Sequence, residues 1–254
     1  MGSMSEFYDQ LSLINWALLV IAAIGIGVTK SGFSGVSLLH VLVFAHVFGA
    51  KASTGVVLPM LIVGDVLAML MFGKHADWVY VRRMMPPAIL GVLIGWMLMH
   101  RLSESLYRPI TGGIILMLAS MQLARLRNEN WLASIPHSAI FAWGMGIAVG
   151  VTTMLANAAG PVFGLFLISI GLPKKEFVGT AAWFFLILNV LKIPFSWNLG
   201  LIGEQSLMVN ALLAPLILLG LFAGRAIAKG ISQKSFEMVI LVLSIVAAMQ
   251  LLLV

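Results

Sequence analysis

Ten apolar runs follow one another along this chain, and each is close to the length of a helix that crosses a bilayer. A membrane-spanning helix needs about 20 apolar residues for about 30 Å of hydrocarbon. Only 9% of the 254 residues are charged and 61% are hydrophobic, whereas soluble proteins are about 25% charged. We therefore predict an all-α polytopic membrane protein. The predicted segments are 12–29, 34–49, 52–72, 84–100, 106–124, 138–155, 158–171, 177–197, 206–228 and 235–254.

The charged residues indicate membrane orientation and not nucleic-acid binding. The formal net charge is +6, but the basic residues are scattered through short loops between apolar runs, as in membrane proteins. There are no cysteines, which excludes disulfides, thiolate metal sites and cysteine nucleophiles. Residues 1–11 are predicted to be an N-terminal tail without the basic region of a signal peptide, and we interpret residues 1–3 as a cloning remnant.

The sequence repeats itself, which predicts two related halves. The run Gly27-Val28-Thr29-Lys30 matches Gly150-Val151-Thr152-Thr153. Further along, Pro86, Gly91, Gly95 and Ser103 correspond at a constant offset to Pro215, Gly220, Gly224 and Ser232. We predict a first repeat at 12–125, an inter-repeat loop at 126–137 and a second repeat at 138–254. An odd number of segments in each half implies inverted repeats with broken or half helices that meet near the midplane.

The distribution of basic residues predicts how the chain is oriented. If all ten segments cross and the N-terminus is outside, the outer loops receive only Lys51, Arg101 and Arg108. The inner side receives Lys30, Lys74, Arg82, Arg83, Arg125, Arg127, Lys174, Lys175, Arg225, Lys229 and Lys234. Positive loops stay on the cytoplasmic side, so we predict a multi-pass protein of the cell inner membrane with both termini periplasmic. Segments 34–49 and 158–171 are short, and half-helices that end at mid-membrane remain an alternative for them.

The break after the first segment is a candidate anion site. It contains Thr29, Lys30, Ser31, Gly32 and Ser34. A broken helix frees backbone N–H groups at the start of its second piece, where the helix dipole is positive. Hydroxyls and the Lys30 ammonium would add donors and charge. The alternative is that the glycines allow close helix packing while Lys30 extends to the inner surface.

A second break occupies the matching place in the other half. It supplies Thr152, Thr153, Asn157 and Gly160 as candidate substrate-binding residues, with Pro161 suited to the first turn of the next helix and Asn157 to its cap. Matching breaks in inverted repeats are expected to meet near the midplane, where secondary transporters bind substrate. We therefore assign the residues of both breaks to one binding site for a small anion.

Three polar residues inside apolar segments are candidates for coupling or gating. Asp65 and Asn189 lie at similar places in the two halves, and a buried carboxylate is a candidate proton or cation site. The alternative is that Asp65 is a structural partner of Lys30 or of a hydroxyl. His40 can titrate during a transport cycle, although a hydrogen-bonded packing histidine is the favoured interpretation. We interpret Lys192, near Pro194, as a lysine that extends to the outer interface.

No enzyme motif, metal site or cofactor site is found in the sequence. It has no nucleophile elbow, no phosphate-binding loop and no zinc-binding HExxH. The protein is therefore predicted not to be an enzyme and to need no metal or cofactor. Its expected partners are a small anionic substrate and the lipid bilayer, with no nucleic acid, and it is expected to be a monomer or a homodimer.

The two breaks and the segment after the second one resemble the TauE/SafE sulfite exporter family of inner-membrane anion permeases. The resemblance rests on the glycine-rich first break, on Thr152 to Pro161, on Gly171-Leu172-Pro173 and on Phe177 to Phe195. It covers nearly the whole chain and implies a secondary transporter that exports sulfite or an organosulfonate. Members typically have a tighter glycine run and a Val-Pro step in the first half, where this chain has His40 nearby.

Two other functions remain open from the sequence. The first is an uptake permease for a sulfur oxyanion or for another small ion, because sequence does not determine direction. The second is a membrane-embedded subunit or enzyme without transport. The paired breaks argue against the second, because a scaffold has no use for two matched discontinuities.

Overall fold

A computed structural model of the chain describes residues 11–33, 35–127, 138–230 and 233–253. This part is helical, with short connections and no strands. Its helices are α2 (Leu13–Lys30), α3 (Val36–Phe48), α4 (Ala52–Phe72), the 3₁₀ turn η1 (Gly73–His75), α5 (Trp78–Arg101), α6 (Glu104–Arg127), α7 (Ala139–Ala156), α8 (Gly160–Ser169), α9 (Lys174–Asn198), α10 (Glu204–Gly230) and α11 (Gln233–Leu253).

Each predicted apolar segment corresponds to one of these helices, so the predicted fold class is confirmed. In the described residues, seven helices are long and apolar enough to cross a membrane. The two segments predicted to be short are α3, with 13 residues, and α8, with 10 residues. At 1.5 Å per residue they are about 20 Å and about 15 Å long. Neither is long enough to span about 30 Å of hydrocarbon alone.

Helix α2 packs against α10 so closely that only glycine fits at the contact. A Cβ atom on Gly27 would lie 2.0 Å from the carbonyl oxygen of Ile217. A Cβ atom on Gly220 would lie 2.0 Å from the carbonyl oxygen of Ile24. Small residues at such contacts let helix backbones approach each other in a membrane protein.

Helices α5 and α7 make the corresponding contact with the corresponding glycines. A Cβ atom on Gly91 would lie 2.2 Å from the carbonyl oxygen of Ile147, and one on Gly150 would lie 2.0 Å from that of Ala88. The sequence repeat pairs Gly27 with Gly150 and Gly91 with Gly220. Each contact therefore joins the first helix of one half to the fourth helix of the other, an arrangement compatible with two inverted repeats.

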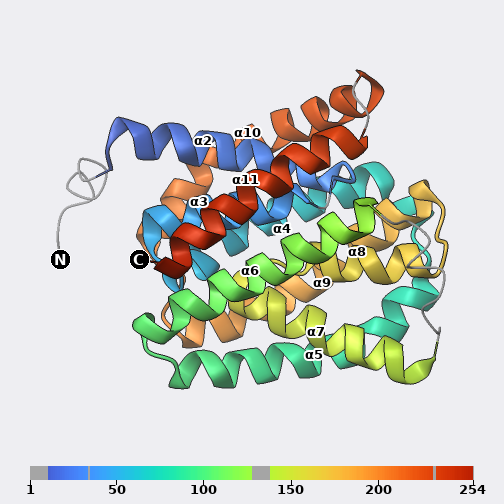
Figure 1. The fold of residues 1–254 in the computed structure, drawn as a ribbon, viewed down its shortest axis with the longest axis horizontal. Coiled ribbons are helices and arrows are strands. Elements are labelled where there is room, and N and C mark those ends of the chain that lie inside the picture. Colours follow the sequence, from blue (N-terminus) through green and yellow to red (C-terminus); the bar gives the residue numbers. More distant parts are fainter. Residues whose placement is uncertain (1–10, 34, 128–137, 231–232, 254) are drawn as a thin grey trace.

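The helix ends lie at two opposite ends of the bundle (Figure 1). Helix α2 begins and α11 ends at the left, where α3 meets α4, α5 meets α6 and α9 meets α10. At the right, α4 meets α5 and α8 meets α9. The sequence places Lys74, Arg82, Arg83, Lys174 and Lys175 beside the right-hand connections and Lys51, Arg101 and Arg108 beside the left-hand ones. More of these basic residues thus lie beside the right-hand connections than beside the left-hand ones, and the assignment of the right-hand end to the cytoplasm stays a prediction.

Candidate functional site

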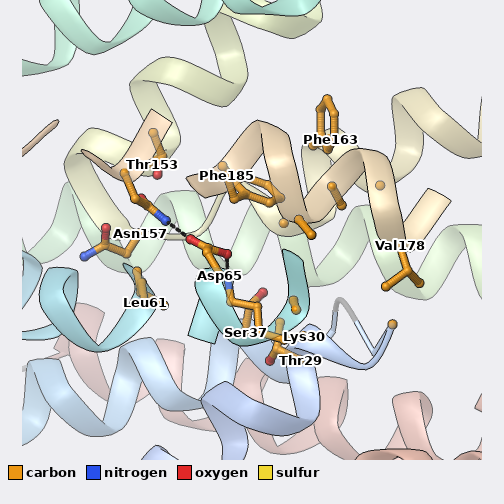
Figure 2. Close-up of a pocket in the computed structure, with 18 of the residues that line it drawn as sticks. Thr29, Lys30, Ser37, Leu61, Asp65, Thr153, Asn157, Phe163, Val178 and Phe185 are labelled. Carbon is orange, nitrogen blue, oxygen red and sulfur yellow. Dashed lines mark hydrogen bonds and ion pairs between the residues drawn. The ribbon is translucent and has the colours of Figure 1, made fainter. Parts of the chain in front are cut away.

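A cavity of about 70 Å³ lies inside the bundle, where the two helix breaks come together (Figure 2). Thr29 and Lys30 end α2, and Gly32 follows with a φ of +113°, a conformation that favours glycine. Thr153 and Asn157 at the end of α7, and Gly160 at the start of α8, line the opposite wall. The fold therefore brings the two breaks to one site, although they are far apart in the sequence.

Lys30 and Asp65 form an ion pair at the wall of this cavity. The Lys30 ammonium donates to Asp65 Oδ1 at 2.5 Å, and Asn189 Nδ2 donates to Asp65 Oδ2 at 2.7 Å (Figure 2). Asp65 is fully buried. A charge inside a membrane protein requires a partner, so Asp65 is the structural partner that Lys30 needs. The Lys30 ammonium also lies 5.5 Å from the centre of the Phe185 ring, within cation–π range.

Lys192 is buried beside the cavity, which corrects the prediction that it extends to the outer interface. Its side chain is only 1% exposed. The ammonium donates to Asn157 Oδ1 at 2.6 Å, to the Thr153 carbonyl at 2.9 Å and to Thr153 Oγ1 at 3.0 Å. It also lies 3.3 Å from Asn189 Oδ1. Because all of these acceptors are neutral, Lys192 has no ion-pair partner among the described residues.

The formal charges of the buried side chains at this site sum to one positive charge. Lys30 and Lys192 contribute two cations, and Asp65 contributes one anion between them, linked to Lys192 through Asn189. An unbalanced buried charge is unfavourable unless a counter-ion or strong hydrogen bonds satisfy it. The arrangement therefore favours binding of an anion.

Asn157 adopts a conformation that the sequence analysis did not predict. It is the C-cap of α7 in the left-handed region, with a φ of 51°, and Ala159 is the N-cap of α8. Asn157 therefore ends one helix and does not cap the next, whereas Pro161 lies in the first turn of α8 as predicted. Asparagine tolerates this conformation better than most residues do. Its Nδ2 donates to the Thr54 carbonyl at 2.8 Å, so the side chain joins Lys192 to α4.

His40 faces the same cavity from α3. It is 2% exposed, and neither ring nitrogen has a hydrogen-bond partner among the described residues. The favoured prediction of a hydrogen-bonded packing histidine is therefore wrong for this structure. A buried polar group without a partner is destabilising by about 1–3 kcal/mol. A ligand in the cavity would supply the missing partner.

The other predicted site residues occupy different places. Ser31 donates to the Val28 carbonyl and lies against Gly224, and Thr152 donates to the Ala148 carbonyl. Neither lines the cavity. The Thr29 hydroxyl donates to the Gly25 carbonyl at 3.0 Å, although Thr29 itself lines the cavity. Ser34 lies outside the described residues.

Sequence reasoning missed Ser37 and Phe185 as cavity residues and dismissed Lys192. Ser37 precedes His40 by three residues, so the two share a face of α3. Two polar residues at that spacing in a short apolar helix indicate a polar face, and this pattern could have identified Ser37 as a cavity residue. For Lys192 the sequence offers no such signal, because a lysine near a helix end looks the same whether it is buried or extended to the interface.

The comparison with known families agrees with this architecture. The sequence model of the family described as sulfite exporter TauE/SafE matches residues 17–251 of the chain. The chain belongs to the TauE/SafE family. This membership implies a multi-pass membrane transporter of sulfur anions. Searches of curated proteins and of solved structures found no match. The TauE/SafE match covers both halves and therefore both breaks that build the cavity.

Proposed function

We propose that this TauE/SafE protein is a secondary transporter that exports a small sulfur oxyanion, sulfite in the first place, across the bacterial inner membrane. The observation that supports the proposal best is the unbalanced positive charge of Lys30, Asp65 and Lys192 at a buried cavity. Such a charge is rare inside a membrane and usually marks an ion pathway. The singly charged, protonated form of sulfite (hydrogensulfite) in the cavity would balance it.

The size of the cavity favours a small anion over a long organosulfonate. Its volume is about 70 Å³, and on the same measure about 10–15 Å³ holds one water molecule. The space therefore suits a solute of a few heavy atoms. A sulfonate with a long organic substituent would require the cavity to widen.

The proposed ligands come from both breaks and from α3. Thr29, Lys30, Thr153, Asn157 and His40 present polar groups at the cavity wall. The backbone at Gly32 and Gly160 completes the proposed contact, with the N-terminus of α8 oriented to favour an anion. The positive end of the α8 dipole thus adds to the polar side chains in favouring an anion. Ser31, Ser34 and Thr152 are not required by this binding mode.

Asp65 has a separate proposed role as the resident counter-ion of Lys30. It neutralises Lys30 when no substrate is bound, and the incoming oxyanion competes with it for the ammonium. Asn189 keeps the carboxylate in place through its bond to Oδ2. This competition would couple substrate binding to movement of α2 against α4, because Lys30 and Asp65 lie on these helices. The same proposal includes coupling of anion transport to proton movement, with Asp65 or His40 as the group that binds the proton.

Export without a nucleotide is energetically reasonable for this cargo. Movement of one negative charge out of a negative interior is favourable by about 2.3 kcal/mol per 100 mV. The predicted orientation places the basic end of the bundle, with Lys74, Lys174 and Lys175, at the cytoplasmic side. Those positive charges would attract anions to the inner entrance.

A matched pair of threonine variants tests the proposed site. In vesicles that contain the reconstituted protein, Thr153→Val should reduce sulfite flux at least tenfold, because Thr153 Oγ1 contacts Lys192 and lines the cavity. Thr152→Val is the control, since its hydroxyl bonds only to carbonyls of its own helix. Equal sulfite flux in the two variants would contradict the proposed site, and no sulfite flux in the unaltered protein would contradict the proposed cargo.

Counterflow with opposed gradients tests the direction separately. Vesicles loaded with sulfite at the cytoplasmic side of the protein should release it faster under an inside-negative potential than under none. Faster accumulation against that potential would instead support uptake. The cargo and the site would stand in that case, and only the direction would change.

A further inference from the structure

A second, smaller cavity shares Asn157 with the main one. Its volume is about 10 Å³, and its polar wall is formed by Ser53, Thr54, Thr111 and Asn157. A space of this size holds about one water molecule. Among the described residues, Asn157 is the one that lines both cavities.

The two cavities lie along one face of α4. Ser53 and Val57 line the small cavity, and Leu61, Asp65 and Ala68 line the main one. The spacing of three to four residues keeps all five positions on the same side of the helix. From Ser53 to Ala68 the helix rises about 22 Å, which is most of the hydrocarbon thickness. A helix face that lines cavities over this length is long enough to form one wall of a transport path.

The cavities approach opposite ends of the bundle. The small one reaches the start of α4, whose connection to α3 lies at the left in Figure 1. The main one reaches the start of α9 through Phe177 and Val178, and that helix starts at the opposite end. Together they extend most of the way from one end to the other. Asn157 is common to the walls of both.

Thr111 contributes a buried hydroxyl to the wall of the small cavity. Its side chain is 1% exposed, and its hydroxyl has no hydrogen-bond partner among the described residues. In addition, the cavity lies at the N-terminus of α4, where the helix dipole is positive. A hydroxyl donor and a positive helix end together suit an oxyanion.

We propose that the small cavity is the far half of the transport path and that Asn157 is the gate that separates it from the main cavity. Thr111 is the hydroxyl ligand that receives the oxyanion after it passes the gate. The identity of this oxyanion rests on the proposed function, whereas the path and the gate rest on the cavities. In the closed state Asn157 Nδ2 bonds to the Thr54 carbonyl and its Oδ1 accepts from Lys192. An anion that draws the Lys192 ammonium away removes one of these bonds and loosens the gate.

The absence of cysteine from the chain allows a direct test by thiol labelling. Single cysteines are introduced as Ser37→Cys in the main cavity and Thr111→Cys in the small one. The probe is a small, membrane-impermeant anionic methanethiosulfonate in sulfite-free buffer. The Thr111→Cys thiol should react when the probe is added at the α4-start side. The Ser37→Cys thiol should react only when the probe is added at the α9-start side.

Removal of the gate should then expose the main cavity from the α4-start side. Asn157→Gly deletes the side chain and suits the left-handed backbone. In this background the labelling rate of Ser37→Cys from the α4-start side should rise at least tenfold. Asn157→Asp is the second variant. It can still accept from Lys192 but cannot donate to the Thr54 carbonyl, so it should increase labelling as well. Thr152→Cys, which lines neither cavity, should react from neither side.

Two outcomes would overturn the proposal. One is a Thr111→Cys thiol that does not react from the α4-start side. The other is an unchanged Ser37→Cys rate in both Asn157 variants. The labelling needs no substrate, so its failure is separable from failure of the proposed function. If labelling is as expected but sulfite is not transported, the cargo is wrong and the path stands. If sulfite is transported while Thr111→Cys stays unreactive, the path is wrong and the cargo stands.

Discussion

Lys192 Nζ lies 2.6 Å from Asn157 Oδ1, and this contact joins a buried charge on α9 to the break between α7 and α8. Asn157 in turn bonds to α4 through the Thr54 carbonyl. One amide thus connects α9, the break between α7 and α8, and α4, which carries the Asp65 carboxylate. A transporter needs such a connection because binding energy at the site has to change the arrangement of helices.

Removal of the Lys192 charge should weaken substrate binding. Lys192→Met brings the net charge of the buried cluster from one positive to zero. We expect at least tenfold weaker sulfite binding, which corresponds to about 1.4 kcal/mol. The measurement is the unfolding temperature in detergent as the sulfite concentration is raised. Lys74→Met, at an exposed position near η1, is the control and should leave the dependence unchanged. Equal weakening in both variants would mean that overall charge and not the site is responsible.

Disruption of the Lys30–Asp65 pair should destabilise the fold. Lys30→Met leaves the fully buried Asp65 carboxylate without its cation, and loss of one partner of a buried pair is destabilising by about 3–5 kcal/mol. The double variant Lys30→Met with Asp65→Asn removes both charges and should recover most of the unfolding free energy. Thermal unfolding in detergent measures the stability of the single and the double variant. A single variant as stable as the unaltered protein would show that Asp65 does not depend on Lys30.

His40 should be more important for transport than for stability. Both ring nitrogens lack partners among the described residues, so His40→Leu removes an unfavourable buried polar group, worth about 1–3 kcal/mol. We expect unfolding at an equal or higher temperature together with a clear loss of sulfite flux. Loss of both stability and flux would instead assign His40 a structural role. Vesicle transport and thermal unfolding of the same preparation distinguish the two.

Two glycines of α7 form a matched test of helix packing. A Cβ atom on Gly150 would lie 2.0 Å from the Ala88 carbonyl oxygen, whereas one on Gly144 would meet nothing within 4 Å. Gly150→Ala should therefore force α5 and α7 apart and destabilise the protein by about 1–3 kcal/mol. Gly144→Ala should be neutral or slightly stabilising, because alanine favours helix. Equal unfolding temperatures of the two variants would contradict the close contact.

Cysteine accessibility in intact cells tests the predicted orientation. Gly203→Cys lies before α10 and Lys174→Cys begins α9, at opposite ends of the bundle. Both positions are exposed. An impermeant maleimide should label Gly203→Cys from outside and label Lys174→Cys only after the cells are opened. The reverse pattern would place both termini in the cytoplasm and contradict the positive-inside assignment.

The sequence alone determined the helices and the location of the breaks. Apolar length and glycine or proline interruptions are local properties, so the predicted segments match the helices from α2 to α11. The sequence repeat also paired Gly27 with Gly150 and Gly91 with Gly220, and the structure places these four glycines at its close helix contacts. The reason is physical: in a bilayer the backbone must form helices, and hydropathy then decides how long they are. The site residues Thr29, Lys30, Thr153, Asn157 and Gly160 were all named from the breaks.

The tertiary structure decided which polar side chains face the same space. Lys192 is a buried partner of Asn157 because of how α9 is rotated against α7, and no local pattern encodes that rotation. Thr152 and Thr153 are neighbours in sequence, yet only Thr153 lines the cavity. Successive residues on a helix differ in direction by about 100°, so the phase of each helix against its neighbours selects one and excludes the other. That phase is set by packing across the whole bundle and appears only when the helices are assembled.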